Sequence, residues 1–216
     1  MTRVRGSEVW AVPGFRRYFL GRTISTFGSA FGILALTFAV LEATGSAADL
    51  GIVLGASAVP ALLLMLIGGV VGDRLERRRI LVSTDLVMGA TQLAAAACFA
   101  FGFETIALIA GLQMVRGAAS AFFNPASTGM LPTIVPASQV QSANAVLGMA
   151  GNVSGIVGPA AAGVVIATTS PATALVVDAG TYFVSALFLW SLPRSRGRVQ
   201  AGMKVLDDVR EGWREF

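Results

Sequence analysis

The sequence contains no histidine, a single cysteine and few charged residues. Of its 216 residues, 13% are charged and 55% are hydrophobic. Soluble domains carry about 25% charged residues, so a soluble domain of this composition would have too little polar surface to stay in solution. The missing histidine argues against a metal centre or an imidazole proton relay, and we expect neither a metal nor a cofactor. Cys98 alone cannot form an intramolecular disulfide.

Six apolar runs are long enough to cross ~30 Å of hydrocarbon as helices, which takes about 20 residues each. A helix satisfies its backbone hydrogen bonds internally, as lipid requires. The alternative, the helical core of a large soluble protein, does not explain six consecutive runs of spanning length. The sequence therefore predicts an all-α membrane protein built as a six-transmembrane-helix bundle. The predicted spans are residues 18–41, 50–72, 80–101, 105–123, 143–168 and 172–192, between an N-terminal segment 1–17 and a linker 193–216.

The basic residues gather before the first run, between the second and third, and after the sixth. The connections 42–49, 102–104 and 169–171 contain none, and their charges are Glu42, Asp49 and Glu104. Cytoplasmic loops are rich in Lys and Arg, so both termini and residues 73–79 are predicted to be cytoplasmic, in a protein of the plasma (inner) membrane. An even number of spans also places both ends on one side. This orientation explains the net charge of +4, and we expect no nucleic-acid partner.

The connection between the second and third runs, GVVGDRLERRRIL (residues 69–81), has glycines before Asp73 and arginines after it. Small residues let helices approach closely, whereas the arginines are also explained as a topological anchor. The stretch resembles the signature loop of the major facilitator superfamily between helices two and three, although Glu76 stands in place of its second glycine. The resemblance implies a conformational gate, and the simple anchor stays open as the alternative. The implied gating residues are Gly69, Asp73, Arg74, Arg77 and Arg78.

A second motif, SGIVGPAAAG (residues 154–163), lies in the fifth run. Proline removes a helical hydrogen bond and favours a kink, although glycine and proline are common in membrane helices. The motif is similar to the glycine-proline motif of exporters in the same superfamily. The stretch LQMVRGAASAFFNPA resembles the membrane-embedded arginine motif of the superfamily, with Arg116 as its arginine. The stretches FRRYFLGRTISTFGSAF and FFNPASTGMLPTIVP resemble the branch of transmembrane secretion effectors, which includes siderophore and macrolide efflux proteins. The residues implied in the kink are Gly155, Gly158, Pro159 and Gly163.

The resemblance implies the fold of the N-terminal half of a twelve-helix major facilitator, built from two inverted three-helix repeats. It implies a secondary active transporter for proton-coupled efflux of small molecules such as drugs, siderophores or macrolides. The expected partners are the lipid bilayer, a small-molecule substrate, and the other six-helix half or a second copy. Residues 193–216 would lead into a seventh helix, and their Val205, Val209 and Trp213 predict a short amphipathic helix.

Three other functions are alternatives to the exporter. An importer fits the glycine-proline motif less well than an exporter does. A membrane enzyme would need clustered catalytic groups, whereas the carboxylates here are isolated and histidine is absent, so we expect no enzyme. The chain also lacks the Gly-x-x-x-x-Gly-Lys-Ser/Thr pattern of nucleotide-binding loops. A non-transporting truncated fragment or membrane scaffold remains the alternative.

A stripe of polar residues marks the fourth run. A charge near the bilayer centre costs at least ~2.5–3.5 kcal/mol, so it needs a partner, water or a function. Gln113, Arg116, Ser120 and Asn124 recur at three- and four-residue steps and share one helix face. We expect this face to line the substrate path. The first run has hydroxyl residues that either line the same cavity or join helices: Thr23, Ser25, Thr26 and Ser29.

Three further charges lie inside predicted spans. Arg22 either lines the path or reaches the headgroups by snorkelling. Asp85 is expected to pair with Arg116 or to share a network with Asp73. Asp178 is either a proton-coupling carboxylate or a hydrogen-bonded residue near the interface. Each three-helix unit would then open with an arginine-bearing span and close with an aspartate-bearing one.

Overall fold

The computed structural model describes residues 9–192, apart from the side chains of Asp73 and Arg74. The amphipathic helix predicted for the linker lies outside the described residues. Within them, six helices are long and apolar enough to cross a membrane, which confirms the predicted bundle. They are α1 (Pro13–Thr44), α2 (Ala47–Arg74), α3 (Arg77–Phe101), α4 (Ile106–Ile134), α5 (Val140–Thr168) and α6 (Pro171–Trp190), with short 3₁₀ turns η1 (Val9–Ala11) and η2 (Ala137–Gln139).

Short turns connect α1 to α2, α3 to α4 and α5 to α6 at one end of the bundle. Helices α1 and α3 stop at Gly45 and Gly102, whose φ angles of 64° and 71° lie in the left-handed region that glycine adopts without strain. The next helices begin after Ser46, Thr105 and Ser170, each of which accepts a hydrogen bond from the backbone N–H three residues later. The turn chemistry thus fixes where each helix ends and the next begins.

Helix α4 is longer than the sequence predicts. The expected span stops at Phe123, whereas the helix continues through Pro125 and Pro132 to Ile134. Proline is tolerated inside membrane helices because neighbouring helices and side chains can satisfy the carbonyls that it frees. At 1.5 Å per residue, Arg116 lies about 27 Å from the end of α4 at Ile134, so it belongs to the middle of the bundle.

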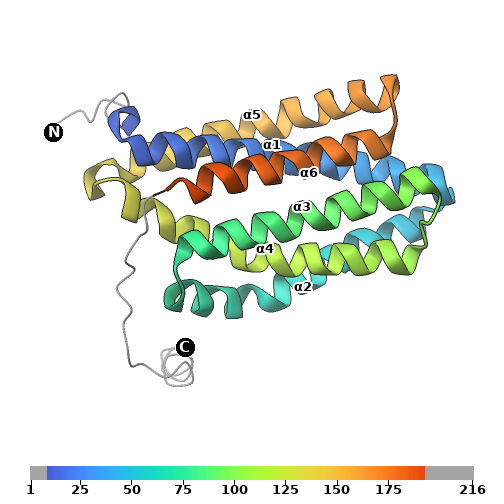
Figure 1. Ribbon diagram of the computed structural model, residues 1–216, viewed down its shortest axis with the longest axis horizontal. Coiled ribbons are helices and arrows are strands. Elements are labelled where there is room, and N and C mark those ends of the chain that lie inside the picture. Colours follow the sequence, from blue (N-terminus) through green and yellow to red (C-terminus); the bar gives the residue numbers. More distant parts are fainter. Residues whose placement is uncertain (1–8, 193–216) are drawn as a thin grey trace.

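The six helices pack as two groups of three, which meet where α3 contacts α6 (Figure 1). Helix α1 lies between α5 and α6, α4 lies between α2 and α3, and α3 packs against α6. If α1, α2 and α3 are exchanged for α4, α5 and α6, every one of these neighbour relations is preserved. This is the pattern of two inverted three-helix repeats.

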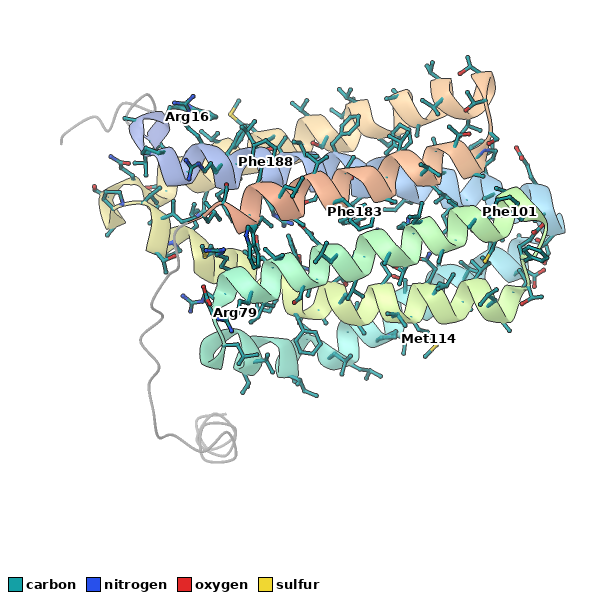
Figure 2. All side chains as sticks on the ribbon, viewed as in Figure 1. Arg16, Arg79, Phe101, Met114, Phe183 and Phe188 are labelled. Carbon is teal, nitrogen blue, oxygen red and sulfur yellow. The ribbon has the colours of Figure 1, made fainter. Side chains whose placement is uncertain are left out.

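The two ends of the bundle carry opposite charges. Figure 2 shows Arg16 and Arg79 at one end and Phe101 at the other. We name the first the basic end, which holds Arg16, Arg17, Arg77, Arg78 and Arg79, and the second the acidic end, which holds Glu42, Asp49 and Glu104. This separation agrees with the charge pattern of the sequence.

Two apolar clusters form the core, with a polar layer between them. One cluster, toward the basic end, includes Phe15 and Leu81, and the other, toward the acidic end, includes Phe31 and Ile109. Between the two clusters, each of α1, α3, α4 and α6 contributes polar side chains. The polar layer consists of Arg22, Ser25, Ser29, Gln92, Gln113, Arg116 and Asp178.

Helices α2 and α5 leave large apolar faces uncovered. Leu62 and Leu66 of α2 are 71% and 84% exposed, and Ile156 of α5 is 76% exposed. In a bilayer, such faces contact lipid or another helical unit. The polar layer is therefore enclosed mainly by α1, α3, α4 and α6.

Candidate transport site

Asp178 of α6 lies at the end of a buried chain of hydrogen bonds. Gln113 Nε2 of α4 donates to Gln92 Oε1 of α3 over 3.0 Å, and Gln92 Nε2 donates to Asp178 Oδ2 over 2.6 Å. All three side chains are buried, and Asp178 Oδ1 has no hydrogen-bond partner among the described residues. Unpaired polar groups are costly away from water, so the chain stabilises Asp178 only in part.

The carboxyl group of Asp178 occupies space provided by two glycines of α1. A Cβ atom added at Gly28 would lie 2.9 Å from Asp178 Oδ1, and one added at Gly32 would overlap the carboxylate itself. Helices with glycine at a contact can approach closely. Gly32 therefore makes room for the buried acid, whereas Gly28, one turn earlier on α1, makes room mainly for Thr181, whose side chain an added Cβ would overlap.

Arg116 of α4 points toward Tyr182 of α6 and is close enough to Asp178 for electrostatic attraction. Its Nη2 donates to the Tyr182 hydroxyl over 3.0 Å, and that hydroxyl is 2.8 Å from Ser29 Oγ of α1. Arg116 Nε is buried without a hydrogen-bond partner among residues 9–192. The arginine thus links α4 to α6 and, through Tyr182, to α1.

Asp85 of α3 does not form the predicted pair with Arg116. It is fully buried, and neither of its oxygens makes a hydrogen bond within the described part of the chain. Its charged neighbour is Arg22 of α1, and the Ser185 hydroxyl of α6 faces it without reaching hydrogen-bond geometry. The Gln92–Gln113 bond sets the register of the antiparallel α3 and α4, so Arg116 is level with Gly89, about one turn from Asp85. Because of this offset, the predicted pair of Asp85 with Arg116 does not form.

One cavity of about 180 Å³ brings Arg22 and Arg116 together. Most of the predicted stripe reaches it, because Ser120 and Asn124 also line it, whereas Gln113 turns into the hydrogen-bond chain. Arg22 stacks over the ring of Phe123, with its Cζ 4.8 Å from the ring centroid. The remaining lining residues are Ser25, Ser29, Met88 and Tyr182.

The hydroxyl residues of α1 divide between two cavities. Ser25 and Ser29 face the cavity that Arg116 lines, whereas Thr23 and Thr26 face a neighbouring cavity of about 320 Å³. Arg22 lines both cavities. The arginine therefore forms part of the wall between two polar spaces.

The arginines of the signature loop bind the ends of other helices. Arg77 Nη1 donates to the Gly129 carbonyl of α4 over 2.9 Å, and Arg78 Nη1 donates to the Leu192 carbonyl after α6 over 2.8 Å. A cation near the carbonyl end of a helix is favourable. These contacts tie the start of α3 to α4 and α6. The side chains of Asp73 and Arg74, also predicted here, lie outside the described ones.

The glycines of the loop motif have different surroundings. A Cβ atom added at Gly68 would overlap the backbone carbonyl of Ala121 in α4, and one at Gly72 would touch Ala126 at 3.8 Å. At Gly69, the glycine that the motif singles out, an added Cβ meets nothing within 4 Å. Within this bundle, Gly68 and not Gly69 allows the close contact of α2 with α4, as Gly117 of α4 does against Ser57.

The glycine-proline motif lies in the uninterrupted helix α5, with Pro159 inside it. A Cβ atom added at Gly158 would lie 2.9 Å from Ala30 Cβ of α1. At Gly155 and Gly163 an added Cβ meets nothing within 4 Å. Only Gly158 therefore serves the packing of α5 on α1, and the other two glycines face outward.

The sequence prediction missed Gln92 and Tyr182. Tyr182 lies four residues after Asp178, so it shares a helix face with that predicted site residue. Gln92 lies seven residues after Asp85, two turns along the same helix. Both polar residues thus lie at helical spacing from a predicted buried charge. This spacing is the signal in the sequence that could have identified them.

The sequence is similar to known proteins over most of its length. A family model described as "Transmembrane secretion effector" matches residues 10–215 of the chain. The chain belongs to this family of major facilitator transporters. Its members are membrane transporters and not enzymes, as the sequence led us to expect.

Three relatives illustrate the range of this family. The chain is 29% identical over 205 residues to the uncharacterised MFS-type transporter YfiS of Bacillus subtilis, covering 92% of this chain and 48% of the relative. It is 33% identical over 188 residues to the multidrug efflux pump Tap of Mycolicibacterium fortuitum, covering 84% and 46%. It is 27% identical over 175 residues to the staphyloferrin A transporter of Staphylococcus aureus, covering 79% and 44%. The chain thus spans about half the length of the curated relatives it matches.

Proposed function

We propose that the protein is a proton-coupled exporter of small molecules, in which the six helices described here work against a second six-helix unit. The observation that carries this proposal is the position of Asp178. It is a buried carboxylate with one unpaired oxygen, held by Gln92 and attracted to an arginine that lines a cavity. Intramembrane carboxylates in such positions are typical of proton relays.

Proton uptake by Asp178 would alter contacts between three helices. The neutral acid no longer attracts Arg116 as a counter-ion, and its hold on the amide of Gln92 weakens. Because Gln92 is on α3 and Arg116 on α4, both helices lose part of their attachment to α6. A proton on one atom can therefore shift the walls of the cavity.

The relatives support transport out of the cell. One of them is a multidrug efflux pump, and another is described as a putative bacilysin exporter from Bacillus amyloliquefaciens, 30% identical over 148 residues. The exposed faces of α2 and α5 offer a surface for the second unit. The loop arginines at the basic end are proposed to gate by exchanging their present helix-end contacts for contacts with that unit.

Transport in membrane vesicles tests the proton coupling. Everted vesicles from cells expressing the gene that encodes these residues are placed in a solution of ethidium or calcein, a cationic and an anionic dye, and a proton gradient is imposed. We expect gradient-driven dye accumulation, and its loss in Asp178→Asn at unchanged expression. The exposed Glu42→Gln at the acidic end is the matched control and should transport normally. Full activity of Asp178→Asn would exclude Asp178 as the proton site.

The proposed orientation places the basic end in the cytoplasm. In a Cys98→Ser background, a cysteine at Ala47 should react with an impermeant maleimide added to intact cells. A cysteine at the exposed Arg79 should react only after the cells are permeabilised. The reverse labelling pattern would overturn the orientation.

A further inference from the structure

The cavity shared by Arg22 and Arg116 presents two positive charges and no negative one. Its other polar lining groups are neutral, and no carboxylate from the described residues reaches it. Asp85 and Asp178 attract the two arginines from within the helix packing and do not line the cavity. The space itself is therefore bordered by guanidinium groups.

Most hydrogen-bond donors of these two arginines are unused. Each guanidinium has five N–H donors. Arg22 makes no side-chain hydrogen bond to any described residue and rests on Phe123. Arg116 donates to Tyr182, while its Nε is buried without a partner. An acceptor that enters the cavity would satisfy donors that are now unpaired, which is a gain in free energy.

We infer that this cavity binds the oxyanion group, a carboxylate or phosphate, of the transported molecule, with Arg22 and Arg116 as its two cationic arms. The inference deepens the proposed function by naming the chemical class that the site takes. A guanidinium binds a carboxylate or phosphate through two parallel hydrogen bonds. Phe123, Tyr182 and Met88 complete the wall with apolar surface for a ring or chain next to the anion.

The size of the cavity limits what it holds within this unit. At about 180 Å³ it is smaller than the ~300–1,000 Å³ of pockets that enclose drug-sized molecules. It therefore accepts the anionic end of a substrate together with about one ring. The rest of the substrate is left to extend toward the second six-helix unit.

The test compares four ligands that share a benzene ring and differ in the charge of its substituent. Benzoate, phenylphosphonate, benzamide and benzylamine are added to the purified chain in detergent. Thermal unfolding is followed by the reaction of Cys98, the sole cysteine, with a maleimide dye. A ligand that binds the folded state raises the unfolding midpoint with increasing concentration. We expect this for one or both anions and not for benzamide or benzylamine, and the stronger anion distinguishes a carboxylate from a phosphate site.

Variants locate the effect. Arg22→Gln and Arg116→Gln should each weaken anion binding at least about tenfold, the loss expected for charge-assisted hydrogen bonds. Arg79→Gln removes an exposed arginine paired with Glu76 and should bind as the unaltered chain does. If a variant fails to fold, the charge series on the unaltered chain still decides.

The outcomes separate this inference from the transport proposal. Equal stabilisation by benzamide or benzylamine, or anion binding unchanged in both arginine variants, overturns the anion site while proton-driven efflux stands. Loss of proton dependence in vesicles overturns the coupling while selective benzoate binding stands. Absence of any shift with all four ligands also overturns the anion site.

Discussion

The two buried aspartates occupy corresponding places in the two three-helix repeats, yet their surroundings differ. Asp178 faces Gln92 of α3, two turns beyond Asp85, and Asp85 faces Ser185 of α6, two turns beyond Asp178. The long amide of Gln92 reaches Asp178 over 2.6 Å, whereas the short hydroxyl of Ser185 makes no hydrogen bond. The arginines differ likewise, because the Arg116 guanidinium donates to Tyr182, whereas the Arg22 guanidinium donates to no described residue and lies over the ring of Phe123.

The comparison shows that the same helix packing holds one aspartate in a hydrogen-bond network and leaves the other without a hydrogen bond. The site around Asp178 is held by a network and has a defined geometry. The site around Asp85 has the same register but lacks the side chain that would complete it. We therefore expect substitutions around Asp178 to be costly and the corresponding ones around Asp85 to be tolerated.

Breaking the network at its centre should have the largest effect. Gln92→Leu removes the donor to Asp178 and the acceptor for Gln113 at once, leaving two buried groups unpaired, which we expect to cost about 3–5 kcal/mol. The measurement is unfolding of the purified protein in mixed detergent micelles. Gln113→Leu is the matched control, because it leaves the Gln92–Asp178 bond intact and should cost less. Equal losses would show that Asp178 gains little from Gln92.

Filling the space beside Asp178 should have the next largest effect. Gly32→Ala adds a methyl group that overlaps the carboxylate, and overpacking of this kind costs about 1–3 kcal/mol. Gly180→Ala is the control, since a Cβ atom there meets nothing within 4 Å and alanine favours the helix. The double variant Gly32→Ala with Asp178→Ala should regain part of the loss, and a purely additive result would contradict the contact.

Neutralising each aspartate should change stability in opposite directions. Asp85→Asn removes a buried charge that has no hydrogen bond, so we expect stability to rise by about 1 kcal/mol. Asp178→Asn replaces the acceptor of Gln92 and the counter-ion of Arg116, so we expect a loss of about 1–2 kcal/mol. Thermal unfolding of the two variants in one detergent makes the comparison. Losses of similar size would mean that the two sites are energetically alike.

The smallest effect is expected at Ser185. Its hydroxyl is buried and has no hydrogen-bond partner within residues 9–192. Ser185→Ala should therefore change stability by no more than about 0.5 kcal/mol. A loss well above this value in the same unfolding assay would reveal a hydrogen bond from Ser185 to Asp85 in solution.

The sequence was a good guide to the bundle, because apolar length and basic clusters are local properties. At the end of α4 the helix extends beyond the predicted span, through Pro125 and Pro132 to Ile134. The prolines are tolerated because surrounding helices satisfy the freed backbone groups. That compensation depends on packing and is invisible in one helix alone.

The sequence predicts which charged residues form the candidate site but not which arginine attracts which aspartate. Arg22, Arg116, Asp85 and Asp178 stand out because charges are rare inside apolar runs. Which arginine attracts which aspartate depends on the register and rotation of helices that are distant in sequence. For that reason the expected Asp85–Arg116 pair was wrong, and Tyr182 was missed.

The glycine at position 32 has a consequence for how this protein can vary. The carboxylate of Asp178 occupies the volume that a side chain at position 32 would need. A lineage that gains a methyl group at position 32 must therefore have a smaller or displaced side chain at position 178. We expect positions 32 and 178 to mutate together across the family, with an acid at position 178 only where position 32 is glycine.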